Sequence, residues 1–233
     1  MIRIRLFFFA VCVGFFQSFS LAQGLSDQIR ISLEKATQEK PHVLGGIFLK
    51  NVGEVYHFYA QRGFEPVWSK ASVLTERAYE LRFEIRQAKF DGLKPSDYHL
   101  AYFESAFSLA EQRKKSGEPL SILSLTHLEI VLTDAFFELA EDLAIGKLNP
   151  ASLKATWSIP RRSKSLDHGF LLLEALRNED LRSGLAKLYP KNPLYQKGKQ
   201  LMRELDERAK KDSIAWKPIK IDRLIKVGEY NGQ

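Results

Sequence analysis

Apolar residues recur at steps of three and four along most of the chain, the spacing that lines one face of an α-helix. The longest such stripe consists of Ile122, Leu125, Leu128, Leu132, Phe136, Leu139 and Leu143. Three more apolar side chains lie off it, so the middle turns should contact neighbours on two sides: Ile130, Val131 and Phe137. Gly146 and Pro150 are typical of a helix end. We expect a central helix over about residues 120–145.

Shorter helices are predicted by the same periodicity on both sides of the central one. They cover residues 52–61, 74–90, 97–115, 167–177, 179–188 and 192–211. Ser96 or Asp97 is suited to cap the third and Asn178 the fifth, and Pro193 occupies the first helical position of the last. The predicted fold class is all-α, an irregular multi-helix bundle packed around the long central helix at about residues 120–145.

The two ends of the chain lack a clear helical pattern. Residues 23–50 are polar with weak periodicity, and we interpret them as a lead-in segment to a helical domain over residues 51–215. Residues 216–233 alternate partly between apolar and polar positions. We interpret them as a linker toward a C-terminal module.

The first 22 residues have the composition of a secretory signal peptide. Arg3 and Arg5 precede an apolar run to Phe16, and small residues lead to a predicted cleavage site after Ala22. An uncleaved anchor and a lipoprotein modified at Cys12 are the alternatives. The prediction is export to the periplasm, with no membrane span after signal cleavage.

Signal cleavage would leave residues 23–233, which contain no cysteine because Cys12 is the only one. Disulfides, a thiol nucleophile and cysteine metal sites are then excluded. A chain of this length can bury a core large enough for one domain. Loss of Arg3 and Arg5 leaves 33 basic and 28 acidic residues, a net charge of +5. Outside the cytoplasm such a surface meets anionic envelope polymers or lipid headgroups, or is simply solvated.

The titratable residues do not form a recognisable metal or cofactor motif. The five histidines are His42, His57, His99, His127 and His168, and none has a metal-ligand spacing. The sequence pairs Asp97 with His99 and His127 with Glu129, which we interpret as hydrogen-bonding pairs. No catalytic, cofactor-binding or metal-ligating residue is assigned, and no cofactor is expected.

Three further groups of residues allow a functional interpretation beside a structural one. Glu138, Glu141 and Asp142 could serve a helical muramidase or lytic transglycosylase, but their spacing favours the wet side of the central helix. An aromatic group could stack on sugars, although packing at a helix corner is the usual role; it comprises Tyr56, Phe58, Tyr59, Phe64 and Trp68. A basic group could meet a phosphate or carboxylate, although an exposed loop is the simpler interpretation; it comprises Arg161, Arg162 and Lys164.

Several segments, in order and at similar spacing, resemble the helical scaffold domain of the large periplasmic murein L,D-transpeptidases. They are Phe58–Trp68, Gly92–His99, Leu132–Phe136, Asp142–Pro150, Pro190–Tyr195 and Trp216–Ile219. The resemblance runs from about Val52 to Val227. It implies a link to peptidoglycan crosslinking and cell-wall remodelling, in which a stem peptide is transferred through a thioester on a cysteine.

The family's catalytic motif, Ser-x-Gly-Cys-x-Arg, is absent from this sequence, so no catalytic residue can be transferred from the resemblance. The chain therefore looks like the scaffold part alone. The implied partners are an L,D-transpeptidase catalytic domain, in cis and lost or in trans, and peptidoglycan; nucleic acid is not implied. A periplasmic adaptor or binding protein is the main alternative function, and whether the chain is itself an enzyme stays open.

Overall fold

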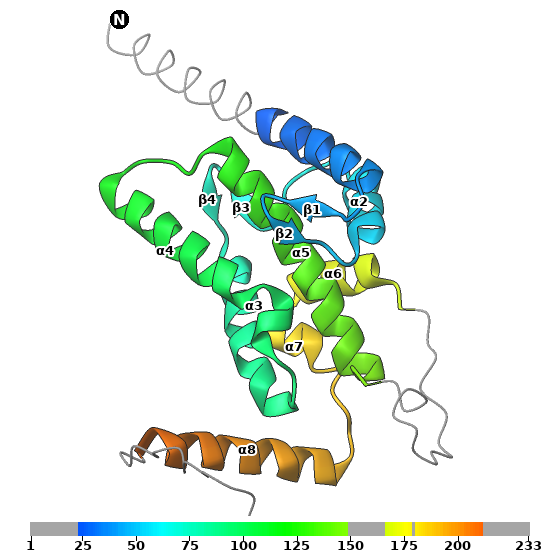
Figure 1. The fold of residues 1–233 in the computed structure, drawn as a ribbon, viewed down its shortest axis with the longest axis vertical. Coiled ribbons are helices and arrows are strands. Elements are labelled where there is room, and N and C mark those ends of the chain that lie inside the picture. The colour runs from blue at the N-terminus through cyan, green and yellow to red at the C-terminus, as the bar shows by residue number, and fades with distance from the viewer. Residues whose placement is uncertain (1–22, 149–165, 179, 212–233) are drawn as a thin grey trace, which may run out of the picture.

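The computed structural model describes residues 23–148, 166–178 and 180–211, and the central helix runs through the middle of them (Figure 1). This helix, α5 (Ile122–Ile145), begins where the Ser121 hydroxyl accepts the backbone N–H of Ser124 at 3.1 Å. Every residue from Leu128 to Ala140 is buried. A helix buried all round must be enclosed by other elements, so the prediction of a central helix is confirmed.

The described chain starts with a helix over residues 23–38, which lies beside the first half of the bundle (Figure 1). It contributes Leu25, Ile29 and Leu33 to the common core. A hairpin of β1 (Val43–Leu44) and β2 (Ile47–Phe48) follows it. The segment interpreted as a lead-in therefore contains a helix, and its apolar residues at i, i+4 and i+8 pack inward.

The next segment contains α2 (Val52–Gln61) and a second hairpin, β3 (Ser69–Lys70) with β4 (Val73–Leu74). Then come α3 (Glu76–Gln87) and the 3₁₀ turn η1 (Ala88–Asp91). The helix predicted over residues 74–90 is shorter than expected at its start, because Leu74 pairs with Ser69 in the hairpin. Its last turn is tightened into η1.

A second 3₁₀ turn, η2 (Pro95–Tyr98), leads into α4 (Leu100–Ser116). Ser96 and Asp97 lie inside η2, so neither caps α4 as predicted. The residue before α4 is instead His99, in the left-handed conformation at φ 59°. This turn aims the His99 ring at α5, where its Nε2 lies 3.2 Å from Asp134 Oδ2.

After the central helix the described chain resumes with α6 (His168–Arg177) and α7 (Leu181–Leu185). Their N-termini are capped by Asp167, which accepts from Phe170 N, and by Asp180, which accepts from Ser183 N. Asn178, predicted to cap the second helix, instead follows the end of α6. The basic group at Arg161, Arg162 and Lys164 lies outside the described residues, as do the predicted signal peptide and linker.

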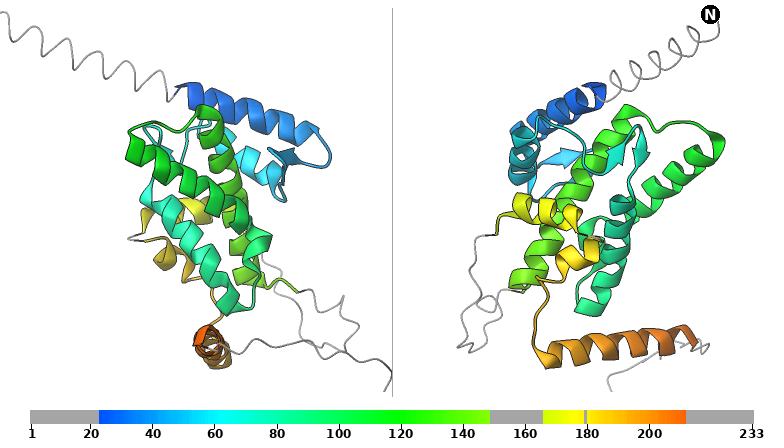
Figure 2. Two further views of the ribbon diagram at one scale, coloured as in Figure 1. Left: turned by 60° about the vertical axis from the view of Figure 1, so that its left-hand side comes forward. Right: turned by 180° about the vertical axis from the view of Figure 1, so that it is seen from behind.

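The last described helix, α8 (Pro193–Lys211), lies across one end of the molecule and is bonded to η1 (Figures 1 and 2). The prediction of a helix opened by Asn192 and Pro193 is confirmed, and the Asn192 side chain accepts the backbone N–H of Leu194 at 2.8 Å. None of the residues of α8 is buried.

The fold is all-α apart from the two short hairpins, as predicted. The aromatic group at the α2 corner packs mainly inward, since Phe58, Tyr59 and Trp68 are buried. Ring contacts extend from it to α5, as between Phe58 and Phe137. In the described ranges, no helix combines the length and the apolar character that crossing a bilayer requires.

Candidate functional site

The feature that distinguishes α5 from an ordinary core helix is its set of buried polar side chains. They are Thr126, Glu129, Thr133, Asp134 and Glu138. A polar group removed from water is costly unless it is hydrogen-bonded, and a charge more so. Their partners therefore show which segments α5 organises.

Glu129 is the most connected of these side chains. Its carboxylate accepts the backbone N–H groups of Val67 and Trp68 at 2.8 Å and 3.0 Å. It also accepts the hydroxyls of Ser69 at 2.7 Å and Tyr59 at 2.9 Å. Burial raises the pKa of Glu129, and these donors act in the opposite direction. The side chain thus supplies the hydrogen-bond acceptors for the non-helical turn that joins α2 to β3.

One turn further along α5, the Thr133 hydroxyl continues the same network. It accepts the indole N–H of Trp68 at 2.9 Å and lies 3.1 Å from the Tyr59 hydroxyl. Burial and the nearby Glu129 charge raise the pKa of Tyr59, so this phenol stays protonated and can donate. Glu129 and Thr133 together fix both large rings of the α2 corner.

Asp134 binds a different pair of segments. Its carboxylate accepts the backbone N–H groups of Lys50 at 3.3 Å and Asn51 at 2.7 Å, immediately before α2. His99 approaches the same carboxylate from η2. Asp134 therefore connects the start of α2 to the turn before α4, through the central helix.

Glu138 lies in a cluster of charges at the next turn of α5. Its Oε1 pairs with the Lys50 ammonium and lies 3.6 Å from that of Lys147. Lys147 also pairs with Asp97 and Asp142, each at 3.0 Å. Within the part of the chain that the structure describes, Glu138 Oε2 has no hydrogen-bond partner.

This cluster bears on two expectations, the position of Glu138 and the pairing of Asp97 with His99. Glu138 is buried rather than on the wet side of α5, because Lys50 and Lys147 neutralise it there. Burial raises the pKa of Glu138, with both lysines opposing this. Asp97 pairs with Lys147, just after α5, and His99 with Asp134 of α5, so the expected Asp97–His99 pair is replaced by these two bonds.

Glu141 belongs to another face of α5, where it meets the first residue of α6. His168 Nε2 lies 3.1 Å from Glu141 Oε2, and His168 Nδ1 lies 2.5 Å from Glu54 Oε2 of α2. An imidazolium can donate to both carboxylates, a neutral ring to only one. The His168 ring also stacks on Phe137. His168 therefore ties α2, α5 and α6 together rather than standing free as an acid or base.

A cavity of about 410 Å³ lies beside His168. It is lined by Gly53, Glu54, His57, Phe58, Gln61, Phe137, Leu166, Asp167, His168 and Gly169. This volume lies within the usual range of small-molecule sites. Its polar groups, however, are already engaged: His57 pairs with Gln61, and Asp167 caps α6.

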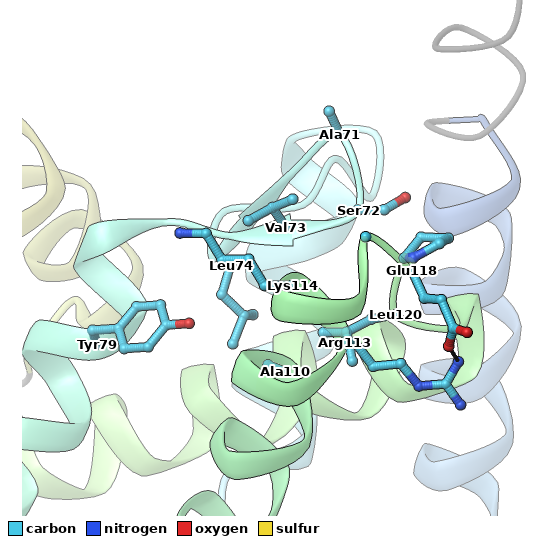
Figure 3. Close-up of a pocket in the computed structure, with 12 residues that line it drawn as sticks. Ala71, Ser72, Val73, Leu74, Tyr79, Ala110, Arg113, Lys114, Glu118 and Leu120 are labelled. Atoms are coloured by element: carbon cyan, nitrogen blue, oxygen red, sulfur yellow. Dashed lines mark hydrogen bonds and ion pairs between the residues drawn. The ribbon is translucent and has the colours of Figure 1, made fainter.

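A second cavity, of about 270 Å³, lies between the β3–β4 turn and the end of α4 (Figure 3). Tyr79 and Leu74 line one side, and the ion pair of Arg113 with Glu118, at 2.5 Å, lines the other. The volume is below the range typical of ligand pockets.

His127 and Glu129, paired in the sequence interpretation, are not brought together by an observed bond. His127 instead lies against Gly45 of the first hairpin, so close that a Cβ there would lie 2.7 Å from the ring. Burial lowers the pKa of His127. Among residues 23–148, 166–178 and 180–211, no three His, Cys, Asp or Glu side chains are grouped so as to hold a metal ion.

The network contains residues that the sequence analysis did not single out, chiefly Lys50, Asp134 and Lys147. Their partners are up to 88 residues away in sequence, as for Lys50 and Glu138. The available signal was the inward position of polar residues on the central helix. This signal indicates that the polar residues need hydrogen-bonding partners, but not which residues supply them.

Comparison with known families gives one match, which covers most of this network. Residues 53–202 match the family model described as Scaffold domain. The chain belongs to this family. The match begins in α2 and ends within α8, so the Scaffold domain includes α5 and the turns at Trp68 and His99 that are bonded to it, while Lys50 and Asn51 precede the match. No curated protein and no solved structure matches the chain.

Proposed function

We propose that this chain is the helical scaffold of a murein L,D-transpeptidase, exported to the periplasm and acting in peptidoglycan crosslinking and cell-wall remodelling. It would hold a catalytic domain, supplied in cis or in trans, that carries the reactive cysteine. The Scaffold domain match over residues 53–202 supports the first part of this proposal at the level of the domain.

The observation that carries the proposal is the convergence of the family-like segments on α5. Phe58–Trp68 is bonded through Tyr59 and Trp68 to Glu129 and Thr133. Gly92–His99 is bonded through Tyr98 to Asp142, at 2.6 Å, and through His99 to Asp134. Two of the segments that carry the resemblance are therefore bonded to the central helix, which carries two others.

The same bonds favour a scaffold over a glycosidase. Glu138, the carboxyl that a muramidase would use, is paired with Lys50 and Lys147. Glu141 is held by His168. In the glycosidase mechanism one carboxyl must protonate the leaving oxygen and the other must act on water or the sugar; here Glu138 is buried against two lysines, and the partly exposed Glu141 is bonded to His168.

The test uses residues 23–233, labelled peptidoglycan and an acceptor stem peptide. The chain alone should give no crosslinked product and should form no acyl adduct with a carbapenem, as measured by intact mass spectrometry. Mixed with a separately purified L,D-transpeptidase catalytic domain from the same organism, it should form a complex on size-exclusion chromatography and raise the yield of crosslinks.

Turnover by the chain alone would contradict the scaffold role. Absence of both a complex and an effect on crosslinking would contradict the link to L,D-transpeptidases. Release of soluble muropeptides, lost in Glu138→Gln or Glu141→Gln, would favour the muramidase alternative instead.

A further inference from the structure

Helix α8 is attached to the bundle by one of its faces. Tyr195 and Lys199 both bond the buried Asp91 carboxylate of η1, Lys199 at 2.6 Å. About two turns further along, Asp206 pairs with Lys89 at 2.6 Å. These contacts fix which side of α8 faces the bundle and which side faces away from it.

The side of α8 that faces away carries leucines and cations next to one another. At about 100° per residue, six residues lie within about a quarter of a turn of the direction opposite the contacts to the bundle: Leu194, Lys197, Leu201, Leu205, Arg208 and Lys211. The three leucines are 74%, 54% and 48% exposed, and the three cations are exposed as well. Among the residues that the structure describes, the side chains of these cations have no ion-pair or hydrogen-bond partner. We call the six residues the outer face of α8.

The exposed acidic residues of α8 do not cancel the charge of this face. Glu207 is paired with Lys210 at 2.6 Å. Glu204 lies among the cations of the outer face and is bonded to Gln200 at 3.0 Å. Three basic residues and one acidic residue leave the outer face with a net charge of +2.

Charge is also divided unevenly between α8 and the bundle. Residues 186–211 contain eight basic and three acidic residues, a net charge of +5. Residues 23–148 together with 166–185 contain 17 basic and 22 acidic residues, a net charge of −5. Positive charge is therefore concentrated at the end of the molecule across which α8 lies (Figure 2).

We propose that the outer face of α8 binds the surface of an anionic phospholipid membrane. A helix that lies in such a surface places apolar side chains at the boundary of the acyl chains and Lys or Arg side chains against the phosphates. The outer face offers both, and it extends over about 26 Å at 1.5 Å per residue. Because the opposite face is bonded to η1, the bundle would stay in water behind the bound helix.

The combination of leucines and cations favours a membrane over two other occupants. A second copy seated face to face would set two outer faces of equal positive charge against each other, and like charges across an interface are costly. An anionic polysaccharide would pair with the cations but would leave the leucines exposed to water. An anionic membrane is complementary to both groups.

Vesicle flotation tests the proposal on residues 23–233, which lack the predicted signal peptide and therefore its own affinity for lipid. Vesicles of phosphatidylglycerol and phosphatidylcholine in equal parts are compared with vesicles of phosphatidylcholine alone. The chain should bind the anionic vesicles about tenfold or more tightly than the neutral ones, because each cation near the surface contributes. The measurement needs no catalytic domain, so its result does not depend on the proposed scaffold role.

A charge variant should show whether the cations of the outer face contribute. Lys197→Gln combined with Arg208→Gln should weaken binding to the anionic vesicles about fivefold for each charge removed. Lys210→Gln is the control, because Lys210 is already paired with Asp206 and Glu207, and its effect should be smaller.

An apolar variant should show whether the leucines enter the membrane. Leu201→Gln should weaken binding about tenfold, since the side chain would no longer leave water favourably. Leu123→Gln is the matched control, because Leu123 is 54% exposed, as is Leu201, but lies in the first turn of α5. That control should bind as the native chain does, and circular dichroism should show the same helix content in both variants.

Absence of binding, or equal binding to anionic and neutral vesicles, would overturn the proposal, as would equal losses in Leu201→Gln and Leu123→Gln. Dimerisation on size-exclusion chromatography that Leu201→Gln abolishes, without vesicle binding, would assign the outer face to a second copy instead. Binding only by a chain truncated after Lys211 would show that residues 212–233 cover the outer face, and would overturn the proposal as well.

Discussion

The carboxylate of Glu129 accepts the backbone N–H of Trp68 with both oxygens, at 3.0 Å and 3.1 Å, across 61 residues of sequence. A backbone N–H in a turn has no ladder or helix partner of its own. Here the central helix provides the acceptor with a buried side chain. The turn between α2 and β3 is therefore held by α5, and its stability should depend on that one carboxylate.

Replacing Glu129 by alanine should be strongly destabilising. The change leaves the N–H groups of Val67 and Trp68 and the hydroxyl of Ser69 buried without an acceptor. Each such donor costs about 1–3 kcal/mol, so the free energy of unfolding should fall by about 3 kcal/mol or more. Urea unfolding followed by circular dichroism measures this. A loss below about 1 kcal/mol would mean that the network contributes little.

Glu138→Gln should change how stability depends on pH. The pKa of Glu138 is raised by burial, so the folded state holds this proton more tightly than the unfolded state does. Its contribution is present at low pH and is lost as the pH rises through the raised pKa. Glutamine has no such titration. The unfolding free energy of the variant minus that of the native chain should therefore increase from about pH 4 to about pH 7.

Glu104→Gln is the control with the opposite sign. The hydrogen bond from Arg86 lowers the pKa of Glu104, so this carboxylate contributes stability above its unfolded pKa. The same difference should then decrease, by a smaller amount because Glu104 is exposed. Parallel slopes for the two variants would show that the Glu138 environment is not what shifts its titration.

Gly184→Ala should separate α7 from α6. A Cβ at Gly184 would lie 2.4 Å from Cα and 2.7 Å from Cβ of Ala175, so the backbone must move. Overpacking of this kind costs about 1–3 kcal/mol, measured as a lower urea midpoint. Gly53→Ala is the matched control, because its Cβ would meet nothing within 4 Å. That variant should be neutral or slightly stabilised; equal losses would contradict the close α6–α7 contact.

The two-residue turn between β3 and β4 should be improved by substitution. Ala71 and Ser72 have φ angles of 49° and 64°, a conformation that favours asparagine and glycine. Changing them to Asn and Gly should raise the free energy of unfolding by about 1 kcal/mol or more. Differential scanning calorimetry would show the higher Tm. An unchanged or lower Tm would mean that the native side chains compensate for the strained backbone.

Asp91→Ala should loosen α8 without unfolding the bundle. The side chain of Asp91 is 2% exposed and accepts from both Tyr195 and Lys199. Hydrogen exchange should become faster across α8 while α5 stays protected. Glu204→Ala is the control, because Glu204 bonds only Gln200 within the described part of α8. Faster exchange in α5 of the Asp91 variant would show that α8 also supports the core.

The sequence by itself determined the helices with strong periodicity or clear end signals. The stripe from Ile122 to Leu143 predicted α5, and Pro193 predicted the start of α8. Both features are local, because a period of 3.6 residues and a fixed proline φ act on the chain whatever surrounds it. The all-α class followed from the same patterns.

Only the tertiary structure decided the hairpins, the helix over residues 23–38 as part of the core, and the polar network of α5. Two-residue strands are too short to show a period, and a cap such as Asp180 is chosen among several suitable neighbours by packing. Glu129, Asp134 and Glu138 have partners that lie up to 88 residues away. The reason is physical. A buried charge must be paired or hydrogen-bonded by the groups that the fold brings next to it, and the spacing of residues along the chain does not indicate which groups these are.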